Sequence, residues 1–321
     1  MKKHTKIWLI TAASLVLIGS VAFVGVMTML GWDFTKLSTV KYETNEYEID
    51  EGYKNISIIT DTADVVLVAD ENLETSVVCH EQKNVKHRVT VQDGTLVIEV
   101  DDTRKWYEYI GINFGTPKIT VCIPQGKYGA LSVRASTGDI DIPKDFSFKD
   151  VDISLSTGDV EFRASASDII KIKASTGDIR IGNISAGALD LSVSTGRVKV
   201  FDVICKGDIK IDVSTGYTGM TDVECKSVIS SGSTGTISLT RVIAQERFDI
   251  ERSTGDVELG DSDAAEIYIK TDTGDVRGSL LSDKTFIVNT DTGKAFYPKE
   301  TTGGRCEITT DTGDIIIEVI S

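Results

Sequence analysis

Ten Thr-Gly dipeptides recur along the chain at a nearly constant spacing. Their glycines are Gly138, Gly158, Gly177, Gly196, Gly216, Gly235, Gly255, Gly274, Gly293 and Gly313. Successive glycines are 19 or 20 residues apart, and each Thr follows Ser or Asp. A fixed period of this size over most of a chain indicates a stack of similar structural units. This repeat, more than the length of the chain, constrains the fold.

Apolar and polar residues alternate on both sides of each dipeptide. In the first unit, Leu131 and Val133 precede the dipeptide, and Ile140 and Ile142 follow it. Such alternation predicts strands with one buried face. The buried set changes from odd to even numbers at Thr-Gly, which indicates a sharp corner where Gly supplies a positive φ. Each unit should therefore contain two short strands, a tight bend and a looser return of about eight residues.

We expect an all-β fold, a parallel β-solenoid similar to a β-helix, with turns of 19–20 residues. Stacked turns pair each strand with its equivalent about 4.8 Å away, which would align the corner glycines. Residues 131–321 form the regular repeats in this prediction. Residues 51–130 form degenerate turns that cap one end; Asp61–Asp64 match the corner pattern with Ala63 in place of Gly.

The N-terminal 30 residues predict a cytoplasmic stub and a transmembrane helix. Ile7–Leu30 carries no charge and is long enough to span a bilayer. Three lysines precede it, which favours a cytoplasmic N-terminus and an extracytoplasmic solenoid. The alternative is a signal peptide cleaved after Ala22. Residues 31–50 are polar and are expected to form a juxtamembrane linker.

The formal net charge of −15 bears on possible partners. An acidic exterior repels anionic polymers, so nucleic acid is excluded as a partner. A cell-envelope polymer or a membrane protein is the expected partner class. The five cysteines match no zinc-binding spacing. Cys205 and Cys225 occupy the same position in consecutive turns, so we expect them to be neighbours, with or without a disulfide.

The motifs that suggest enzymes have simpler explanations. Asp272, Asp291 and Asp311 stand in Asp-Thr-Gly, as in aspartic proteases, but each fills the corner position that Ser fills in other turns. No histidine follows His87, so the regular repeats lack a Ser-His-Asp or Cys-His arrangement. Cys79, His80 and His87 could suggest a metal site, but their irregular spacing is weak evidence for one. We therefore expect no catalytic residues, no cofactor and no metal site.

Two surface features are candidates for binding. Asp139, Asp159 and Asp178 follow consecutive corners and should form an outward column, either merely solvated or binding calcium weakly. An insertion between Val100 and Lys118 contains four aromatic residues. It is either a partner-binding loop or a plug over the open end of the core; the four residues are Trp106, Tyr107, Tyr109 and Phe114.

Repeated Ser-Thr-Gly-Asp-Ile/Val corners behind one membrane segment resemble the bacterial putative-adhesin β-strand-repeat family of unknown function, including its LiaG-like members. The resemblance covers residues 45–321. It implies a role at the cell envelope and supplies no catalytic residues. The leading hypothesis is a membrane-anchored, non-enzymatic solenoid for envelope-associated binding, adhesion or scaffolding. The alternatives are a polysaccharide-active enzyme and an accessory subunit of an envelope-stress sensing system.

Overall fold

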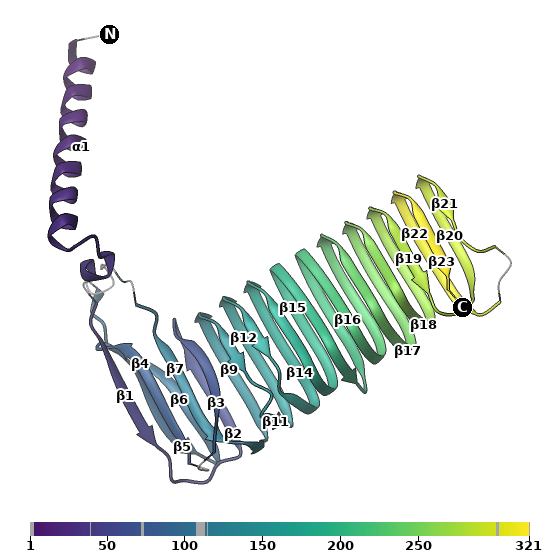
Figure 1. Ribbon diagram of the computed structural model, residues 1–321, viewed down its shortest axis with the longest axis horizontal. Helices are drawn as coiled ribbons and strands as arrows, with labels where there is room; N and C mark the ends of the chain where they lie inside the picture. The colour runs from purple at the N-terminus through teal and green to yellow at the C-terminus, as the bar shows by residue number, and fades with distance from the viewer. Residues whose placement is uncertain are drawn as a thin grey trace.

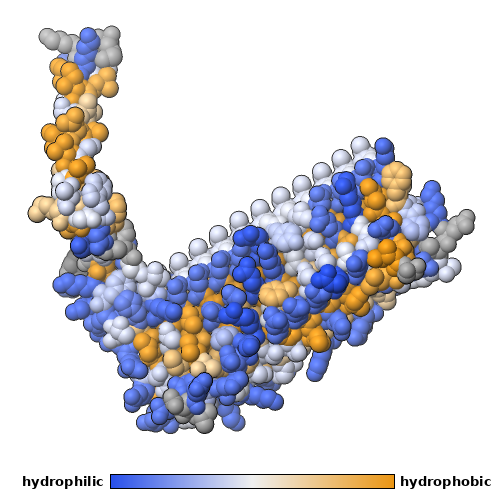
Figure 2. All heavy atoms as spheres, in the orientation of Figure 1, coloured by the Kyte–Doolittle hydropathy of each residue, from blue (hydrophilic) through white to orange (hydrophobic). Residues whose placement is uncertain are grey.

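The computed structural model describes residues 3–38, 40–71, 74–106, 113, 115–299 and 302–320. It contains one long helix, α1 (Lys3–Met29), a short 3-10 helix, η1 (Phe34–Leu37), and an elongated stack of strands (Figure 1). Within α1, the 26 residues from His4 to Met29 form a stretch that is long and apolar enough to cross a membrane. Figure 2 shows that apolar side chains cover much of this helix, which stands clear of the stack.

The regular turns are built from strands that enter and leave the Thr-Gly corners. Those that end at a corner are β9 (Ala130–Thr137), β12 (Asp150–Thr157), β14 (Ser165–Thr176), β20 (Lys284–Thr292) and β22 (Gly304–Thr312). Those that begin after a corner are β10 (Ile140–Ile142), β13 (Val160–Phe162), β19 (Val276–Leu280), β21 (Ala295–Phe296) and β23 (Ile315–Val319). Long strands run on into the next turn in the middle of the stack: β15 (Ile179–Cys205), β16 (Asp208–Thr234), β17 (Ile237–Thr254) and β18 (Val257–Thr273). Two short strands, β8 (Gly126–Lys127) and β11 (Phe146–Phe148), lie in the returns.

Equivalent residues of successive turns pair in parallel and in register. Ile153 of β12 pairs with Val133 of β9 on one side and with Ile172 of β14 on the other. The aliphatic residues before and after the corners are buried in one continuous core that extends from Ile56 to Ile317. The parallel solenoid and the change of phase at the corner are therefore confirmed.

The corner glycines lie in one line along the stack, as expected. Gly216 has a φ of 143°, and a Cβ atom there would lie only 1.7 Å from the carbonyl oxygen of Gly196. The corners thus need glycine for two reasons, since a side chain would strain the backbone and would also collide with the turn beneath.

A second tight bend lies in the return, eight residues after the Ser that precedes Thr-Gly, where the sequence analysis expected a looser connection. Its central residue has a φ between 50° and 58° in five turns; these residues are Asn183, Asp202, Asp222, Arg241 and Asp261. Asn and Asp tolerate this left-handed conformation better than other non-glycine residues. At Arg241, the guanidinium donates to the carboxylate of Asp222 in the turn beneath.

The N-terminal cap differs from the parallel turns expected for residues 51–130. Its strands are β1 (Tyr42–Glu48), β2 (Asn55–Thr60), β3 (Asp64–Asp70), β4 (Ser76–Gln82), β5 (Val85–Gln92), β6 (Thr95–Asp102) and β7 (Lys118–Pro124). β4 pairs antiparallel with β1, β5 and β7, and β5 pairs antiparallel with β6. The linker predicted at residues 31–50 was wrong for residues 42–48, because these form β1 despite a polar sequence. Such a strand is held by its hydrogen bonds to β4 rather than by a buried apolar face.

The turns do not stack in chain order at either end. β2 and β3 lie between β6–β7 and β9–β10. At the C-terminal end, β22 and β23 lie between β18–β19 and β20–β21. The first and last turns of the chain therefore have a neighbouring turn on both sides, which pairs their backbone groups along both edges.

The cysteine prediction agrees with the strand register. Ile204 pairs with Glu224, so the next residues, Cys205 and Cys225, face each other across adjacent turns. Both are buried free thiols in this structure. Burial raises the pKa of Cys225 to about 12, and the neighbouring Cys205 contributes to this shift.

Candidate functional site

The aspartates that follow the corner glycines have a structural role that sequence analysis missed. The Oδ1 atom of Asp139 accepts a hydrogen bond of 2.9 Å from the backbone N–H of Asp159, whose own Oδ1 accepts one of 2.8 Å from the N–H of Asp178. Each carboxylate thus satisfies a donor in the next turn. This ladder explains why Asp recurs after Gly, and calcium binding by the column remains an untested expectation.

The three Asp-Thr-Gly aspartates lie on exposed corners of turns that are neighbours in the stack. The threonines that follow them pair in register, Thr273 with Thr312 and Thr312 with Thr292. Asp272, Asp291 and Asp311 are all exposed. They therefore occupy the surface positions that serine occupies in other turns, as the sequence suggested.

Three of the four aromatic residues of the insertion lie outside the described residues. Trp106 is 78 % exposed. Tyr107, Tyr109 and Phe114 fall outside the described ranges, so the choice between loop and plug stays a prediction. The end of the insertion is attached to β1, because the hydroxyl of Tyr42 donates to the side chain of Asn113 and to the carbonyl of Gly115, both at 2.9 Å.

A large acidic groove lies in the N-terminal cap, where β1 ends and β2 begins. It has a volume of about 760 Å³, which is within the usual range for ligand sites. Six carboxylates line it: Glu46, Glu48, Asp50, Glu51, Asp70 and Glu74. Among the described residues, no lysine or arginine lines this groove. Figure 2 shows hydrophilic residues gathered over this lower part of the cap.

Two tyrosines form a rigid wall of the acidic groove. The rings of Tyr53 and Tyr128 stack with centroids 6.2 Å apart, and Tyr128 also packs against Phe146 and Phe148 of the core. The Tyr53 hydroxyl hydrogen-bonds to that of Thr75 at 2.9 Å. Burial raises the pKa of both tyrosines, so the rings are neutral at physiological pH. Neutral aromatic rings beside carboxylates suit a cationic ligand, which can interact with both.

A second cluster lies inside the cap and brings together two of the residues that the sequence analysis noted. Cys79 and Glu81 point inward from β4, and His87 points inward from β5. Their ligand atoms lie within 4.8 Å of one another. His80 is exposed and stacks on Tyr42 instead, with ring centroids 5.1 Å apart.

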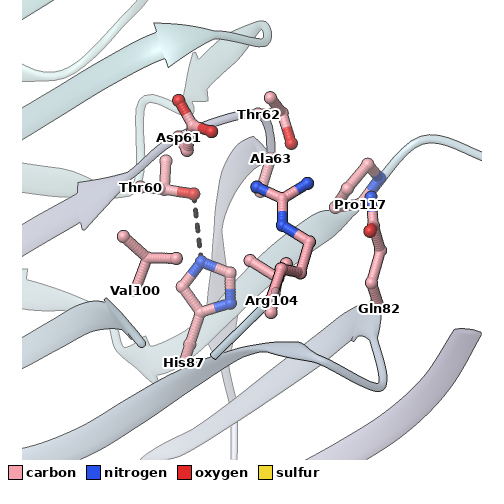
Figure 3. A pocket seen from close by; sticks show the side chains of 10 residues that line it. Thr60, Asp61, Thr62, Ala63, Gln82, His87, Val100, Arg104 and Pro117 are labelled. Atoms are coloured by element: carbon pink, nitrogen blue, oxygen red, sulfur yellow. Dashed lines mark hydrogen bonds between the residues drawn. The ribbon is translucent and has the colours of Figure 1, made fainter. Parts of the chain in front are cut away.

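Hydrogen bonds fix the orientation of His87. Its Nδ1 lies 2.7 Å from Glu81 Oε2, and its Nε2 lies 3.0 Å from Thr60 Oγ1. Figure 3 shows His87 reaching toward Thr60 beside a small cavity, with Arg104 nearby. This cavity has a volume of about 10 Å³, room for a single water molecule. An organic substrate therefore has no access to the imidazole from this side.

An arginine is buried within the regular solenoid. Arg252 is 5 % exposed and occupies a position that is apolar in the first five turns. Its Nη2 donates to the hydroxyls of Thr218 and Ser230 at 3.2 and 3.0 Å. A Cβ atom at Gly232 would lie 2.2 Å from Nη1, so that glycine leaves room for the guanidinium. These neighbours explain why small and hydroxylated residues interrupt the core pattern here.

The comparisons with known proteins concern the fold. At 17 % identity and a TM-score of 0.50, the chain is similar to a solved structure named "putative lipid binding protein" from Parabacteroides distasonis, with 76 % of this chain and 98 % of that one covered. A "putative adhesin" from the same species matches at 14 % identity and a TM-score of 0.50, covering 87 % and 98 %. A comparison with curated proteins gave no match. The model of the Toastrack DUF4097 family matches residues 53–214 and 205–320, and the chain therefore belongs to this family.

Proposed function

We propose that this chain is a membrane-anchored binding module whose acidic groove takes a positively charged segment of a partner protein at the cell envelope. The observation that carries the proposal is the groove itself. It combines a ligand-sized volume of about 760 Å³ with six carboxylates and two stacked tyrosines. Lysine and arginine side chains complement both the carboxylates and the aromatic faces.

The position of the groove suits a partner outside the membrane. The helix α1 precedes the first residue of β1, whereas the groove lies at the other end of that strand. A strand of seven residues spans about 20 Å, so the groove is well separated from the point where the chain leaves α1. With the N-terminus in the cytoplasm, the groove opens to the extracytoplasmic side. The adhesin name of one structural neighbour agrees with a binding role.

The charge of the groove selects among partner classes. Anionic polymers and anionic lipid surfaces are repelled by six carboxylates, whereas a basic protein segment is attracted. A polysaccharide-active enzyme would use paired carboxylates instead to cleave its substrate. The two functions differ in what the groove does to its ligand, so one pair of variants can distinguish them.

The test is titration calorimetry of the full chain in neutral detergent with a synthetic peptide of about ten residues rich in lysine and arginine. The groove variant carries Glu46→Gln, Glu48→Gln, Glu51→Gln and Glu74→Gln. The matched control removes the same charge from exposed solenoid positions and carries Glu224→Gln, Glu246→Gln, Glu251→Gln and Glu258→Gln. Since exposed ion pairs contribute about 0.2–1 kcal/mol each, the groove variant should bind on the order of 10- to 100-fold more weakly.

The control should bind nearly as well as the natural chain. Equal weakening in the two variants would contradict the proposal, because it would show that the peptide responds only to net charge. Release of soluble sugar from cell-wall material by the natural chain, lost in the groove variant, would favour the enzyme instead.

A further inference from the structure

We infer that Cys79, Glu81 and His87 form a structural binding site for a divalent transition-metal ion, zinc being the best match, inside the N-terminal cap. This inference is independent of the acidic groove. It rests on the convergence of three different ligand types at one buried point. Thiolate, imidazole and carboxylate are the protein ligands that zinc uses.

The fold places these residues together through strand alternation and a hairpin. Cys79 and Glu81 are two residues apart on β4 and therefore share its inward face. The chain then turns at Gln82 and Val85, and β5 brings His87 back to the same side. The three side chains are at most 4 % exposed. Both strands are paired with neighbours, so the ligands project from rigid elements.

The distances are compatible with coordination after small side-chain rotations. Tetrahedral zinc with bonds of about 2.0–2.3 Å holds its ligand atoms about 3.4–3.6 Å apart. The three ligand atoms all lie within 4.8 Å of one another, and the shortest separation is the 2.7 Å between His87 Nδ1 and Glu81 Oε2. Binding therefore replaces one hydrogen bond by two metal bonds and draws in the thiol.

Outer hydrogen bonds orient these ligand atoms. Asn45 Nδ2 donates to Glu81 Oε1 at 2.7 Å, and Oε2 accepts a hydrogen bond of 2.7 Å from the backbone N–H of His87 while it faces the imidazole. Thr60 holds Nε2 of His87 at 3.0 Å, which leaves Nδ1 as the coordinating nitrogen. Such partners orient metal ligands and are characteristic of metal sites.

Charge also favours a cation at this point. A bound metal ion would stabilise the thiolate of Cys79 and release the thiol proton. One divalent cation then neutralises a thiolate and a carboxylate that would otherwise be costly to bury together. The adjacent cavity holds about one water, so the site would clamp β4 and β5 together and would not process a substrate.

The test uses the full chain in detergent, stripped with a chelator and titrated with Zn²⁺ in the presence of excess Ca²⁺ to occupy exposed carboxylates. The expected result is one tight zinc equivalent per chain. Titration with Co²⁺ should give the near-ultraviolet charge-transfer band of a cobalt–thiolate bond. Zinc should also slow amide exchange in β4 and β5.

Three variants remove single ligands: Cys79→Ala, Glu81→Gln and His87→Gln. Each should weaken zinc binding by at least about 100-fold, since losing even a second-shell partner costs 10- to 100-fold. The matched controls His80→Asn and Cys306→Ala remove a neighbouring imidazole and a distant buried thiol, and they should bind zinc as the natural chain does. Absence of the cobalt–thiolate band in the natural chain overturns the inference even if a ligand variant fails to fold. Unchanged zinc affinity in folded Cys79→Ala also overturns it.

Discussion

Replacing Gly216 by Ala should destabilise the turns around it far more than a glycine-to-alanine change usually does. The backbone at Gly216 has a φ of 143°, which costs a non-glycine residue about 1–3 kcal/mol. The added Cβ would lie 1.7 Å from the carbonyl oxygen of Gly196, and relieving such overpacking costs about 1–3 kcal/mol more. The total penalty is therefore about 2–6 kcal/mol.

Gly260 provides the matched control. It lies in β18 of the same solenoid, its φ is not positive, and a Cβ there would be 3.6 Å from its nearest neighbour, an ordinary contact. Gly260→Ala should leave stability unchanged within about 1 kcal/mol, because it also reduces the entropy of the unfolded chain. The contrast between the two variants isolates the corner geometry from the change of residue type.

The assay is native-state amide hydrogen exchange on the full chain in detergent. Stability in a stacked repeat protein is largely local, so the effect should centre on the turns that contact Gly216. A loss of about 3 kcal/mol accelerates exchange there roughly 100-fold. If Gly216→Ala exchanges no faster than Gly260→Ala, the proposed need for glycine at the corners is wrong.

Three further predictions concern the interior and the surface of the stack. Ser230→Ala combined with Thr218→Val should cost about 2–4 kcal/mol by chemical denaturation, because it removes both hydroxyl partners of the buried Arg252 guanidinium; in an Arg252→Met background the same pair should cost less than about 1 kcal/mol. Asp159→Ala should lower stability by about 1 kcal/mol through the loss of one bond in the aspartate ladder, while Asp159→Asn, which keeps an acceptor oxygen, should cost less. The pKa of Cys225 is raised from 9.0 to about 12, so the folded state holds the proton that the unfolded state loses; stability should fall as pH rises from about 9 to 12, and Cys225→Ala should reduce this fall in a melting series.

The regular solenoid could be predicted because its constraints are local and repeated. The Thr-Gly corners, the alternation around them and the aligned glycines all follow from the backbone freedom of glycine and the two-residue period of strands. The second bend was also readable in principle, since Asn183, Asp202, Asp222 and Asp261 form a column of residues that tolerate a positive φ. Arg241 breaks the column, and its pairing with Asp222 is a tertiary contact.

The cap and the order of the end turns could not be predicted from the same pattern. Because apolar and polar residues alternate in the same way in every turn, the sequence is equally compatible with β22 beside β18 and with β20 beside β18. The antiparallel pairing of β1 depends on hydrogen bonds to β4, and the polar sequence of β1 gives no sign of it. The missed features are those fixed by long-range pairing.

The candidate sites likewise combine features that the sequence predicts with features that depend on long-range contacts. Cys79 and His87 could be recognised in the sequence as potential metal ligands, together with His80, but Glu81 could not be recognised without assigning a face to each residue of the strand. Strand alternation would have shown that Cys79 and Glu81 share a face. The acidic groove unites Tyr53 with Tyr128, which are 75 residues apart, and only the exchanged order of the first turns brings them together.

Site-specific photo-crosslinking in intact cells tests the proposed binding role most directly. A photoreactive residue in place of Glu51 lies in the acidic groove, whereas one in place of Glu258 lies on the exposed solenoid surface as a control. We expect one crosslinked protein from position 51 that is absent from position 258, and its attached segment should be rich in lysine or arginine. Absence of a groove-specific product, or attachment of the same product at both positions, would contradict the proposed binding role.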